Sequence, residues 1–266
     1  MPIKEILIHL DNIDSCQTRL DVAISLSLNH QAHLTGVYAT SHPFSAAPRA
    51  DAPSQVAEVE ACFRQKTAAA QMTAGWFCAD AAGLHAGVSE RLLLQAYYAD
   101  LIIVGQGGQS AKSLNSPADL PERLVLGAGR PVLVIPNSGE FKTVGEKILL
   151  AWRGGQASSS ALNNAIPFLE LAQQVNVLMV NPGEHFEKQA ANLSTYLGYH
   201  GVAATIDRLS ADDVRAGDIL LNQACDLEID LVVLGVHAGR RMGKTVLGPV
   251  GKHFLEHMTI PVLMSR

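Results

Sequence analysis

The chain contains one apolar stretch twice, first as Ala99-Asp100-Leu101-Ile102-Ile103-Val104-Gly105 and again as Ile229-Asp230-Leu231-Val232-Val233-Leu234-Gly235. A second stretch, Pro131-Val132-Leu133-Val134, returns as Pro261-Val262-Leu263-Met264. Both repeats are offset by 130 residues. A shared offset over two separate strands indicates two copies of a whole domain, because this period is too long for a solenoid repeat.

The opening strand extends the repeat to the start of the chain. Ile6-Leu7-Ile8 returns as Ile148-Leu149-Leu150 at an offset of 142, so the first copy carries 12 more residues in one of its loops. We therefore predict a first domain at residues 1–137 and a second at 145–266, joined by the polar linker Asn137–Val144.

Composition restricts the classes of function. The chain has 266 residues, of which 48% are hydrophobic and 17% charged, and this is typical of a globular protein with two cores. A net charge of −5 argues against a nucleic-acid partner, which needs a basic face. No apolar run approaches the ~20 residues that span a membrane, and the N-terminus lacks a signal peptide's apolar core. We expect a cytoplasmic protein with no membrane partner.

The four cysteines are scattered and show no metal-ligand spacing, so we interpret them as free thiols: Cys16, Cys62, Cys78 and Cys225. We expect no metal site.

Runs such as Leu101–Val104 and Leu231–Leu234 do not alternate between apolar and polar residues, which is typical of a parallel sheet covered on both faces. Helix-period segments separate them, at Ser15–Leu28, Val88–Tyr98, Ser158–Ala172 and Asp212–Cys225. The sequence therefore predicts an α/β fold of two tandem doubly wound domains, each with a five-stranded, mainly parallel sheet between helices. The predicted strands are Glu5–Leu10, His33–Ala39, Gly75–Cys78, Leu101–Val104, Val132–Ile135, Lys147–Trp152, Asn176–Val180, Ala203–Arg208, Leu231–Leu234 and Val262–Met264.

Two loops stand out. His42–Pro53, rich in Pro, Ala and Ser, is predicted to be a mobile loop that helps account for the extra length of the first half. In the second half, a glycine-rich segment follows Gly235, and a helix is predicted to start near Pro249. Helix N-termini bind anions, and Arg240, Arg241 and Lys244 add basic charge, so this segment predicts a phosphate site. The alternative is a solvent-exposed loop with three solvated cations.

The segment that ends in Gly243-Lys244-Thr245 also fits a relaxed P-loop pattern. A P-loop requires a helix that starts at Lys-Thr, whereas Gly248-Pro249 would break that helix within one turn. We therefore reject a P-loop fold.

The repeated strands and the glycine-containing segments that follow them resemble those of a tandem universal stress protein. The resemblance is most specific at Ala99–Gly105 with Arg130–Pro136 and at Asp230–Gly251 with His257–Met264. It implies a Rossmann-like fold of the adenine nucleotide alpha hydrolase type. Nucleotide-binding members carry G-x2-G-x9-G-[ST] after the fourth strand, which holds the phosphates of ATP, and an Asp at the end of the first strand, which holds adenosine.

The first half departs from that motif. It keeps Asp11, Gly105 and Gly108, but Ala118-Asp119 stands where the family has Gly-Ser/Thr. A carboxylate at a helix N-terminus caps the helix and repels phosphate. We infer that the first half has lost its triphosphate site.

The second half keeps Gly235 and Gly248 but has Arg153, Ala238 and Pro249 at the motif's Asp, second Gly and Ser/Thr positions. Proline supplies neither hydroxyl nor N–H, whereas Arg153 offers a phosphate-binding or adenine-stacking cation. If either half binds a nucleotide, the prediction is the second. The candidate nucleotide-binding residues are Ala151, Trp152, Arg153, Val180, Gly235, His237, Ala238, Arg240, Gly248 and Val250.

Two functions of different class remain open. The first is a stress-response regulator that binds ATP with Mg²⁺, or another adenine nucleotide. The second is an interaction module with two degenerate sites and no cofactor. A flavin-binding domain of the electron-transfer flavoprotein type shares the layout. No catalytic residues are assigned, so activity is at most slow ATP hydrolysis. The family resemblance implies an intramolecular pseudo-dimer through Val132–Ile135 and Val262–Met264, and we further expect a homodimer of such chains.

Overall fold

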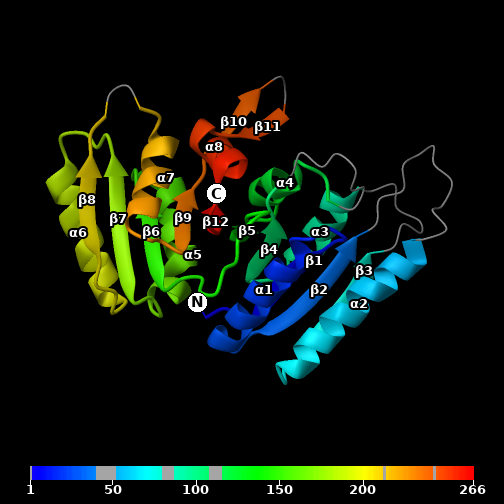
Figure 1. Cartoon of the computed structure of the whole chain (residues 1–266). Helices are drawn as coiled ribbons and strands as arrows, with labels where there is room; N and C mark the ends of the chain where they lie inside the picture. The colour runs from blue at the N-terminus through cyan, green and yellow to red at the C-terminus, as the bar shows by residue number, and fades with distance from the viewer. Residues whose placement is uncertain (1, 40–51, 80–86, 108–115, 212–213, 242–243) are drawn as a thin grey trace. The chain divides into compact units, whose positions relative to one another are not determined.

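The computed structural model describes residues 2–39, 52–79, 87–107, 116–211, 214–241 and 244–266. The chain divides into two compact units, Pro2–Glu140 and Phe141–Arg266, each of which forms its own α/β layer structure (Figure 1). The first unit contains β1 (Glu5–Leu10), α1 (Cys16–His30), β2 (His33–Ala39), α2 (Ala52–Ala69), β3 (Ala74–Ala79), α3 (Val88–Ala96), β4 (Leu101–Gly105), α4 (Leu120–Gly127) and β5 (Val132–Ile135).

The second unit repeats this order and adds a small hairpin. It contains β6 (Lys147–Ala151), α5 (Gly155–Leu169), β7 (Gln174–Val180), α6 (Phe186–Tyr199), β8 (Thr205–Leu209), α7 (Ala216–Asp226), β9 (Leu231–Gly235), β10 (Ala238–Arg241), β11 (Lys244–Leu247), α8 (Pro249–His257) and β12 (Val262–Ser265). The β10 and β11 strands pair antiparallel with each other, apart from the main sheet.

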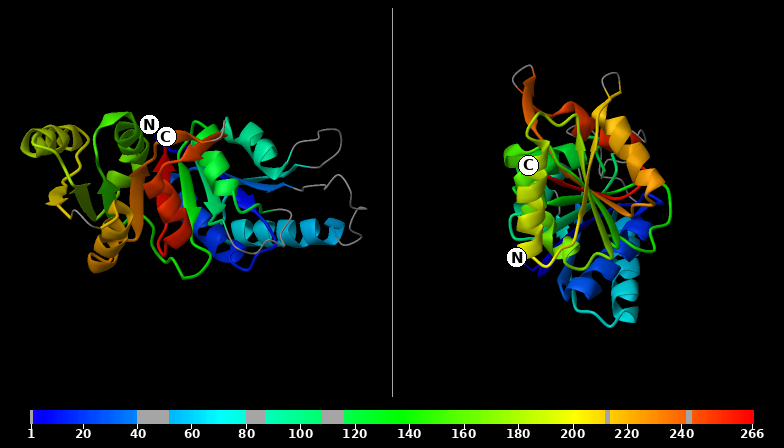
Figure 2. Two further views of the ribbon diagram at one scale, coloured as in Figure 1. Left: turned by 90° about the horizontal axis from the view of Figure 1, so that it is seen from above. Right: turned by 90° about the vertical axis from the view of Figure 1, so that its left-hand side faces the viewer.

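The strands of the two units follow the same order within their sheets. The first unit runs β3-β2-β1-β4-β5 and the second runs β8-β7-β6-β9-β12, and within each unit these pairs are parallel. Right-handed crossovers therefore place α1 and α2 on one face and α3 and α4 on the other, and α5 and α6 lie opposite α7 and α8 in the same way (Figure 2). In each unit the second and third strands lie on one side of the first strand, β1 or β6, and the fourth and fifth lie on its other side. Such folds bind ligands at the carboxyl ends of the strands at this switch point.

The repeated aspartate of the two apolar stretches has a structural role. The Asp100 carboxylate accepts hydrogen bonds from the backbone N–H groups of Lys4 and Glu5 at 2.8 and 3.1 Å. Asp230 likewise accepts three N–H groups at 3.0–3.1 Å, from Gly145, Glu146 and Lys147. Each aspartate thus ties the start of the first strand of its unit to the start of the fourth.

The predicted α/β fold is confirmed. All ten predicted strands form, and the strands that do not alternate are buried on both faces, such as Leu101–Val104 and Leu231–Leu234. The extra length of the first half lies between β2 and β3, where the connection is 34 residues long (40–73) against 24 (181–204) in the second half. Of the predicted loop at His42–Pro53, residues 42–51 lie outside the described residues, and α2 begins at Ala52.

The sequence analysis missed two helices, α2 and α6, and the β10–β11 hairpin. Of the predicted helix at Asp212–Cys225, residues 212 and 213 lie outside the described part, and α7 begins at Ala216. Among the described residues, no helix is both long and apolar enough to cross a membrane.

Candidate functional site

A cavity of about 840 Å³ lies at the carboxyl ends of β6, β7 and β9 in the second unit. The starts of α5, α7 and α8 form its other walls, so its place in the fold is the ligand-binding edge of a doubly wound sheet. Its volume is within the roughly 300–1,000 Å³ of small-molecule sites. Eight of the residues predicted from the sequence line it: Ala151, Trp152, Arg153, Val180, Gly235, His237, Gly248 and Val250.

Two predicted residues, Ala238 and Arg240, are not among those that line this cavity. They lie on β10, where Ala238 pairs with Leu247 and Arg240 pairs with Thr245 of β11. The sequence reading treated the segment after Gly235 as a single loop around a ligand. Antiparallel pairing instead closes it into a hairpin beside α8 (Figure 1), and Arg240 is exposed there.

The N-terminus of α8 forms one wall of the cavity. Gly248 is the N-cap and Pro249 the first helical residue, and the first intrahelical bond runs from the Lys252 N–H to the Gly248 carbonyl oxygen at 3.0 Å. The N–H groups of Val250 and Gly251 precede that bond and so have no partner within the helix. Pro249 removes little here, because the N–H of the first helical residue is outside the intrahelical pattern in any helix.

Arg153 occupies the position in the second unit that Asp11 occupies in the first. Its backbone N–H donates to the Ser158 Oγ at 3.2 Å, which fixes the turn between β6 and α5, and its side chain is exposed where it lines the cavity. Among the described lining residues no Asp or Glu appears, whereas Arg153 and the helix N-terminus both attract anions. The arrangement is therefore suited to a phosphate or carboxylate group.

The packing of α5 against β9 gives a structural reason for glycine at position 235. A Cβ built on Gly235 would overlap the backbone of Ala157 and Ser158 in the first turn of α5. The close packing of α5 on the end of β9 thus requires glycine here whether or not a ligand binds.

In the first unit, the residues at the matching motif positions contact a side chain of the protein itself. Arg19 of α1 is buried beneath the ends of β1 and β4, where its Nη2 lies 2.9 Å from Asp11 Oδ1 and its Nε donates to the His9 carbonyl oxygen at 2.9 Å. A Cβ on Gly105 would overlap the Arg19 guanidinium. The aspartate and glycine that the family motif assigns to a nucleotide therefore contact Arg19 instead.

The ion pair sets the protonation of both groups. Burial alone would raise the pKa of Asp11, but the Arg19 guanidinium, His9 and the Ile13 N–H outweigh it and hold that pKa below its usual value. Burial would lower the pKa of Arg19, yet Asp11 keeps it above its usual value. Both side chains are therefore charged at neutral pH, and the pair is fully formed.

We expect a loss of stability in acid from this pair. A carboxylate whose pKa is lower in the folded than in the unfolded state contributes stability above the unfolded pKa of about 3.9, and that contribution disappears as the pH falls through the folded pKa. The free energy of unfolding, measured by urea denaturation from pH 7 to pH 2, should therefore fall more steeply below about pH 4 in the wild type than in Asp11→Asn/Arg19→Met, which lacks both charges. Parallel curves would contradict this assignment.

Ala118-Asp119, which stands in the first half where the family motif has Gly-Ser/Thr, also makes structural contacts. Asp119 stands at the N-cap of α4 as predicted, but its carboxylate accepts from Arg123 Nε at 2.6 Å rather than from the helix N–H groups. A Cβ on Gly107 would overlap the Ala118 carbonyl oxygen, so the chain is close-packed at this point. The motif position Gly108 lies outside the described residues.

One metal-type spacing was missed in the sequence. His253 and His257 lie one turn apart on α8, with ring centroids 4.5 Å apart, and His253 Nε2 is 2.8 Å from Asp218 Oδ1 of α7. The His-x3-His spacing was the available signal. Within the described residues, however, no group of three or more His, Cys, Asp or Glu side chains is placed to hold a metal ion. His253 and Asp218 connect α8 to α7.

Comparison with known proteins agrees with the geometry. No family model matches the chain. A universal stress protein of Synechocystis, Slr1230, is 27% identical over 172 residues, which are 63% of this chain and 58% of that protein. The crystal structure of a universal stress protein from Archaeoglobus fulgidus aligns with a TM-score of 0.77 over 98% of both chains at 14% identity. The resemblance to tandem universal stress proteins is confirmed.

A protein of unknown function from Pseudomonas aeruginosa has the same fold, with a TM-score of 0.64 and 17% identity over 99% of this chain and 92% of that one. At these identities the solved structures establish the tandem universal-stress fold and not a ligand. The chain spans little more than half the length of Slr1230, so the activity of that relative is not carried over directly.

Proposed function

We propose that this chain is a cytoplasmic stress-response regulator of the universal stress type, whose second unit binds an adenine nucleotide. The observation that carries this proposal is the cavity at the ends of β6, β7 and β9, which has the volume for a nucleotide and faces the N-terminus of α8. The phosphates would lie against the Val250 and Gly251 N–H groups and the Arg153 guanidinium. The ribose and base would lie toward Val180 and Trp152.

The proposal includes one site per chain. In the first unit the Arg19 guanidinium lies against Gly105 and Asp11 and so engages the carboxylate that a nucleotide would use. The two units thus divide the roles, with one that binds a ligand and one that is closed by its own ion pair.

The cavity does not fit a protein-bound Mg²⁺. This hard cation prefers carboxylate and water oxygens, and no Asp or Glu is among the described residues that line the cavity. Mg²⁺ would reach this site only on the phosphates of the nucleotide. The described lining also holds no carboxylate to act as a general base, so the proposal is binding without appreciable hydrolysis.

Gly248→Asp and Gly248→Asn test the site as a matched pair. Both side chains are good N-caps and nearly the same size. A φ of −63° suits either residue, and the contact of the added Cβ with the His237 carbonyl oxygen, at 3.3 Å, is the same in both variants. Only aspartate places a negative charge beside the phosphates. We expect calorimetric titration of nucleotide-free protein to show 1:1 binding of ATP in the wild type, with at least about tenfold weaker binding in Gly248→Asp than in Gly248→Asn.

Adenosine and ATP without Mg²⁺ complete this experiment. Adenosine should bind both variants alike, because it carries no phosphate to repel, and removal of Mg²⁺ should leave ATP binding largely intact. Absence of ATP binding to the wild type would support the second candidate function, an interaction module without a cofactor. The ion pair in the first unit supports that alternative, because the aspartate at the motif position there contacts Arg19.

A further inference from the structure

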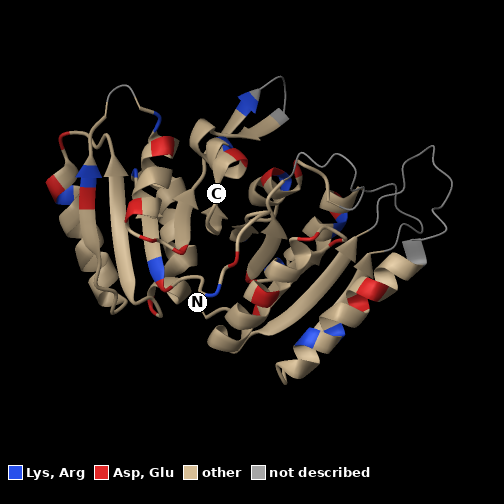
Figure 3. Cartoon of the chain, in the orientation of Figure 1, with Lys and Arg blue, Asp and Glu red and all other residues tan. Residues whose placement is uncertain are grey.

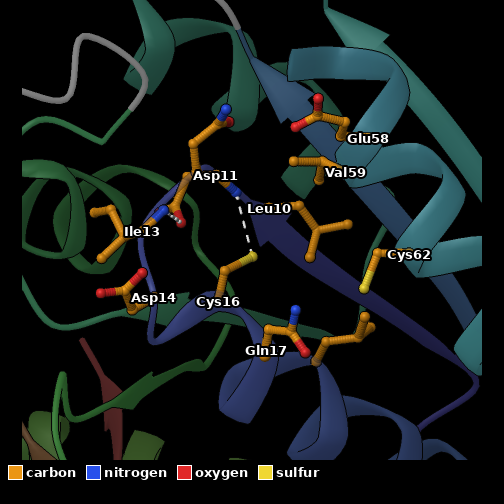
Figure 4. Close-up of a pocket in the computed structure, with 11 residues that line it drawn as sticks. Leu10, Asp11, Ile13, Asp14, Cys16, Gln17, Glu58, Val59 and Cys62 are labelled. Carbon is orange, nitrogen blue, oxygen red and sulfur yellow. Dashed lines mark hydrogen bonds between the residues drawn. The ribbon is translucent and has the colours of Figure 1, made fainter. Parts of the chain in front are cut away.

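A second cavity, of about 540 Å³, lies in the first unit between the β1–α1 turn and α2. Figure 4 shows two cysteines on its walls, Cys16 at the start of α1 and Cys62 on α2, with their sulfur atoms turned toward the space between the helices. Neither belongs to the cavity in the second unit, and the family motif assigns no role to either.

The Cys16 sulfur is held in place by the turn that follows β1. It accepts the backbone N–H of Asp11 at 3.5 Å. Ser158 and Arg153 of the second unit lie 142 positions after Cys16 and Asp11, and there the Ser158 Oγ accepts the Arg153 N–H in the same way. Cys16 is therefore a thiol at a position where the other copy of the domain uses a hydroxyl, and its direction is set by the backbone rather than by loose packing.

Cys62 lines the same cavity as Cys16, from the facing helix α2. Burial raises the pKa of Cys16 above its usual value despite the Arg19 guanidinium nearby, and Asp11 and Cys62 add to that rise. Cys16 is buried and Cys62 half-buried, and both are free thiols. In the second unit the groove between α5 and α6 is lined instead by hydroxyl, amide and aromatic side chains, among them Ser159, Asn192 and Tyr196. The thiol pair is a feature of the first unit alone.

The charges around this cavity favour a cation. Asp14 and Glu58 line it and are exposed, Asp11 is neutralised by Arg19, and no Lys, Arg or His is among the described lining residues. Along α2 the acidic residues lie nearer the N-terminal end and the basic residues nearer the C-terminal end (Figure 3). A positive ion that enters between the helices therefore meets negative charge and two sulfur ligands.

We propose that this cavity binds a soft, thiophilic cation of the Cu(I) class through the sulfur atoms of Cys16 and Cys62. Thiolates select Cu(I), and linear coordination by two sulfur atoms satisfies it. Zn²⁺ requires four ligands, and the described residues offer no group of three. Both thiols lose their protons to solvent as the two Cu–S bonds form, so one Cu(I) and two thiolates leave a net charge of −1. Affinity therefore rises with pH.

The test uses the full chain with Cys78→Ser and Cys225→Ser, so that Cys16 and Cys62 are its remaining thiols. Cu(I) is supplied anaerobically from a coloured chelator, and its transfer to the protein is followed by the loss of the chelator's absorbance. We expect one Cu(I) per chain. Cys16→Ser and Cys62→Asn introduce the residues of the second unit, Ser158 and Asn192. Each should weaken Cu(I) binding by more than the roughly 10–100-fold that is lost when a residue that only hydrogen-bonds a metal ligand is removed.

Three further readouts make the outcome decisive. Circular dichroism and urea midpoints near the parent's would show that each variant folds, as expected because Ser158 holds the same turn in the second unit. Mg²⁺ in excess should not compete, since the ligands are sulfur. Unchanged Cu(I) affinity in Cys16→Ser or in Cys62→Asn, equal competition by Mg²⁺, or a stoichiometry well below one would each overturn the proposal.

Discussion

Arg19→Met is expected to lower the free energy of unfolding of the first unit by about 3–5 kcal/mol, because it leaves the Asp11 carboxylate charged and buried without a partner. The side chains of Arg19 and Asp11 are 1% and 0% exposed, so water cannot replace the lost guanidinium. Methionine matches the length of the arginine stem, which limits the cavity that the substitution creates. For a domain with about 5–15 kcal/mol of stability in total, this loss is a large fraction.

The two tryptophans allow each unit to be followed separately. Trp76 lies on β3 of the first unit and Trp152 follows β6 of the second, so a Trp152→Phe background leaves Trp76 as the fluorescent reporter of the first unit. Urea denaturation followed by this signal should show a lower midpoint for Arg19→Met, while Trp152 fluorescence in a Trp76→Phe background should show an unchanged transition of the second unit.

Two control variants separate the ion pair from a general effect of losing an arginine. Asp11→Asn/Arg19→Met removes both charges and should recover most of the lost stability, because no buried charge remains unpaired. Arg64→Met breaks the exposed pair with Glu60 on α2, where the arginine side chain is 61% exposed, and should cost well under about 1 kcal/mol. A loss below about 1 kcal/mol in Arg19→Met itself would refute the account of the closed first unit.

The central strands could be predicted from sequence because they are short runs of apolar residues buried on both faces, and the duplication showed the first, fourth and fifth strand of each unit twice. The edge strands β3 and β8 are less buried. Helices were harder. In α6 only Leu193 and Leu197 are buried, so its apolar periodicity is weak, and α2 follows a segment rich in Pro, Ala and Ser that is typical of a loop. The hairpin was missed because its arginines and glycines also fit a phosphate-binding loop.

The cavity in the second unit was largely predictable, because parallel strands end at one edge of a sheet and the motif residues follow those ends. The closure of the first unit was not. Arg19 lies on a helix where an arginine ordinarily faces solvent, and only the tertiary fold places it between Asp11 and Gly105. The spacing of Asp11 and Arg19, with Arg19 on the inward face of α1 beside Leu20 and Ala23, was the one available signal.

Gly235→Ala is expected to destabilise the second unit by about 3 kcal/mol, the upper end of the cost of overpacking. The added Cβ would overlap the Ala157 carbonyl group and the Ser158 nitrogen, which are backbone atoms of α5 and cannot rotate away as a side chain can. To make room, α5 must move off β9, and the Ser158 Oγ that accepts the Arg153 N–H moves with it. The urea transition reported by Trp152 in a Trp76→Phe background measures the loss.

This substitution also distinguishes the two reasons for a glycine at the end of β9. Gly239→Ala is the matched control, because no atom lies within 4 Å of the Cβ it would add, and it should change stability by no more than about 0.5 kcal/mol. If Gly235 served only the approach of a ligand, Gly235→Ala would keep the stability of the wild type and lose ATP binding alone. A large loss of stability shows instead that the glycine is required by helix packing. Ligand binding is then better tested at Gly248, where an added Cβ lies 3.3 Å from the nearest backbone atom, whereas at Gly235 it overlaps the backbone of α5.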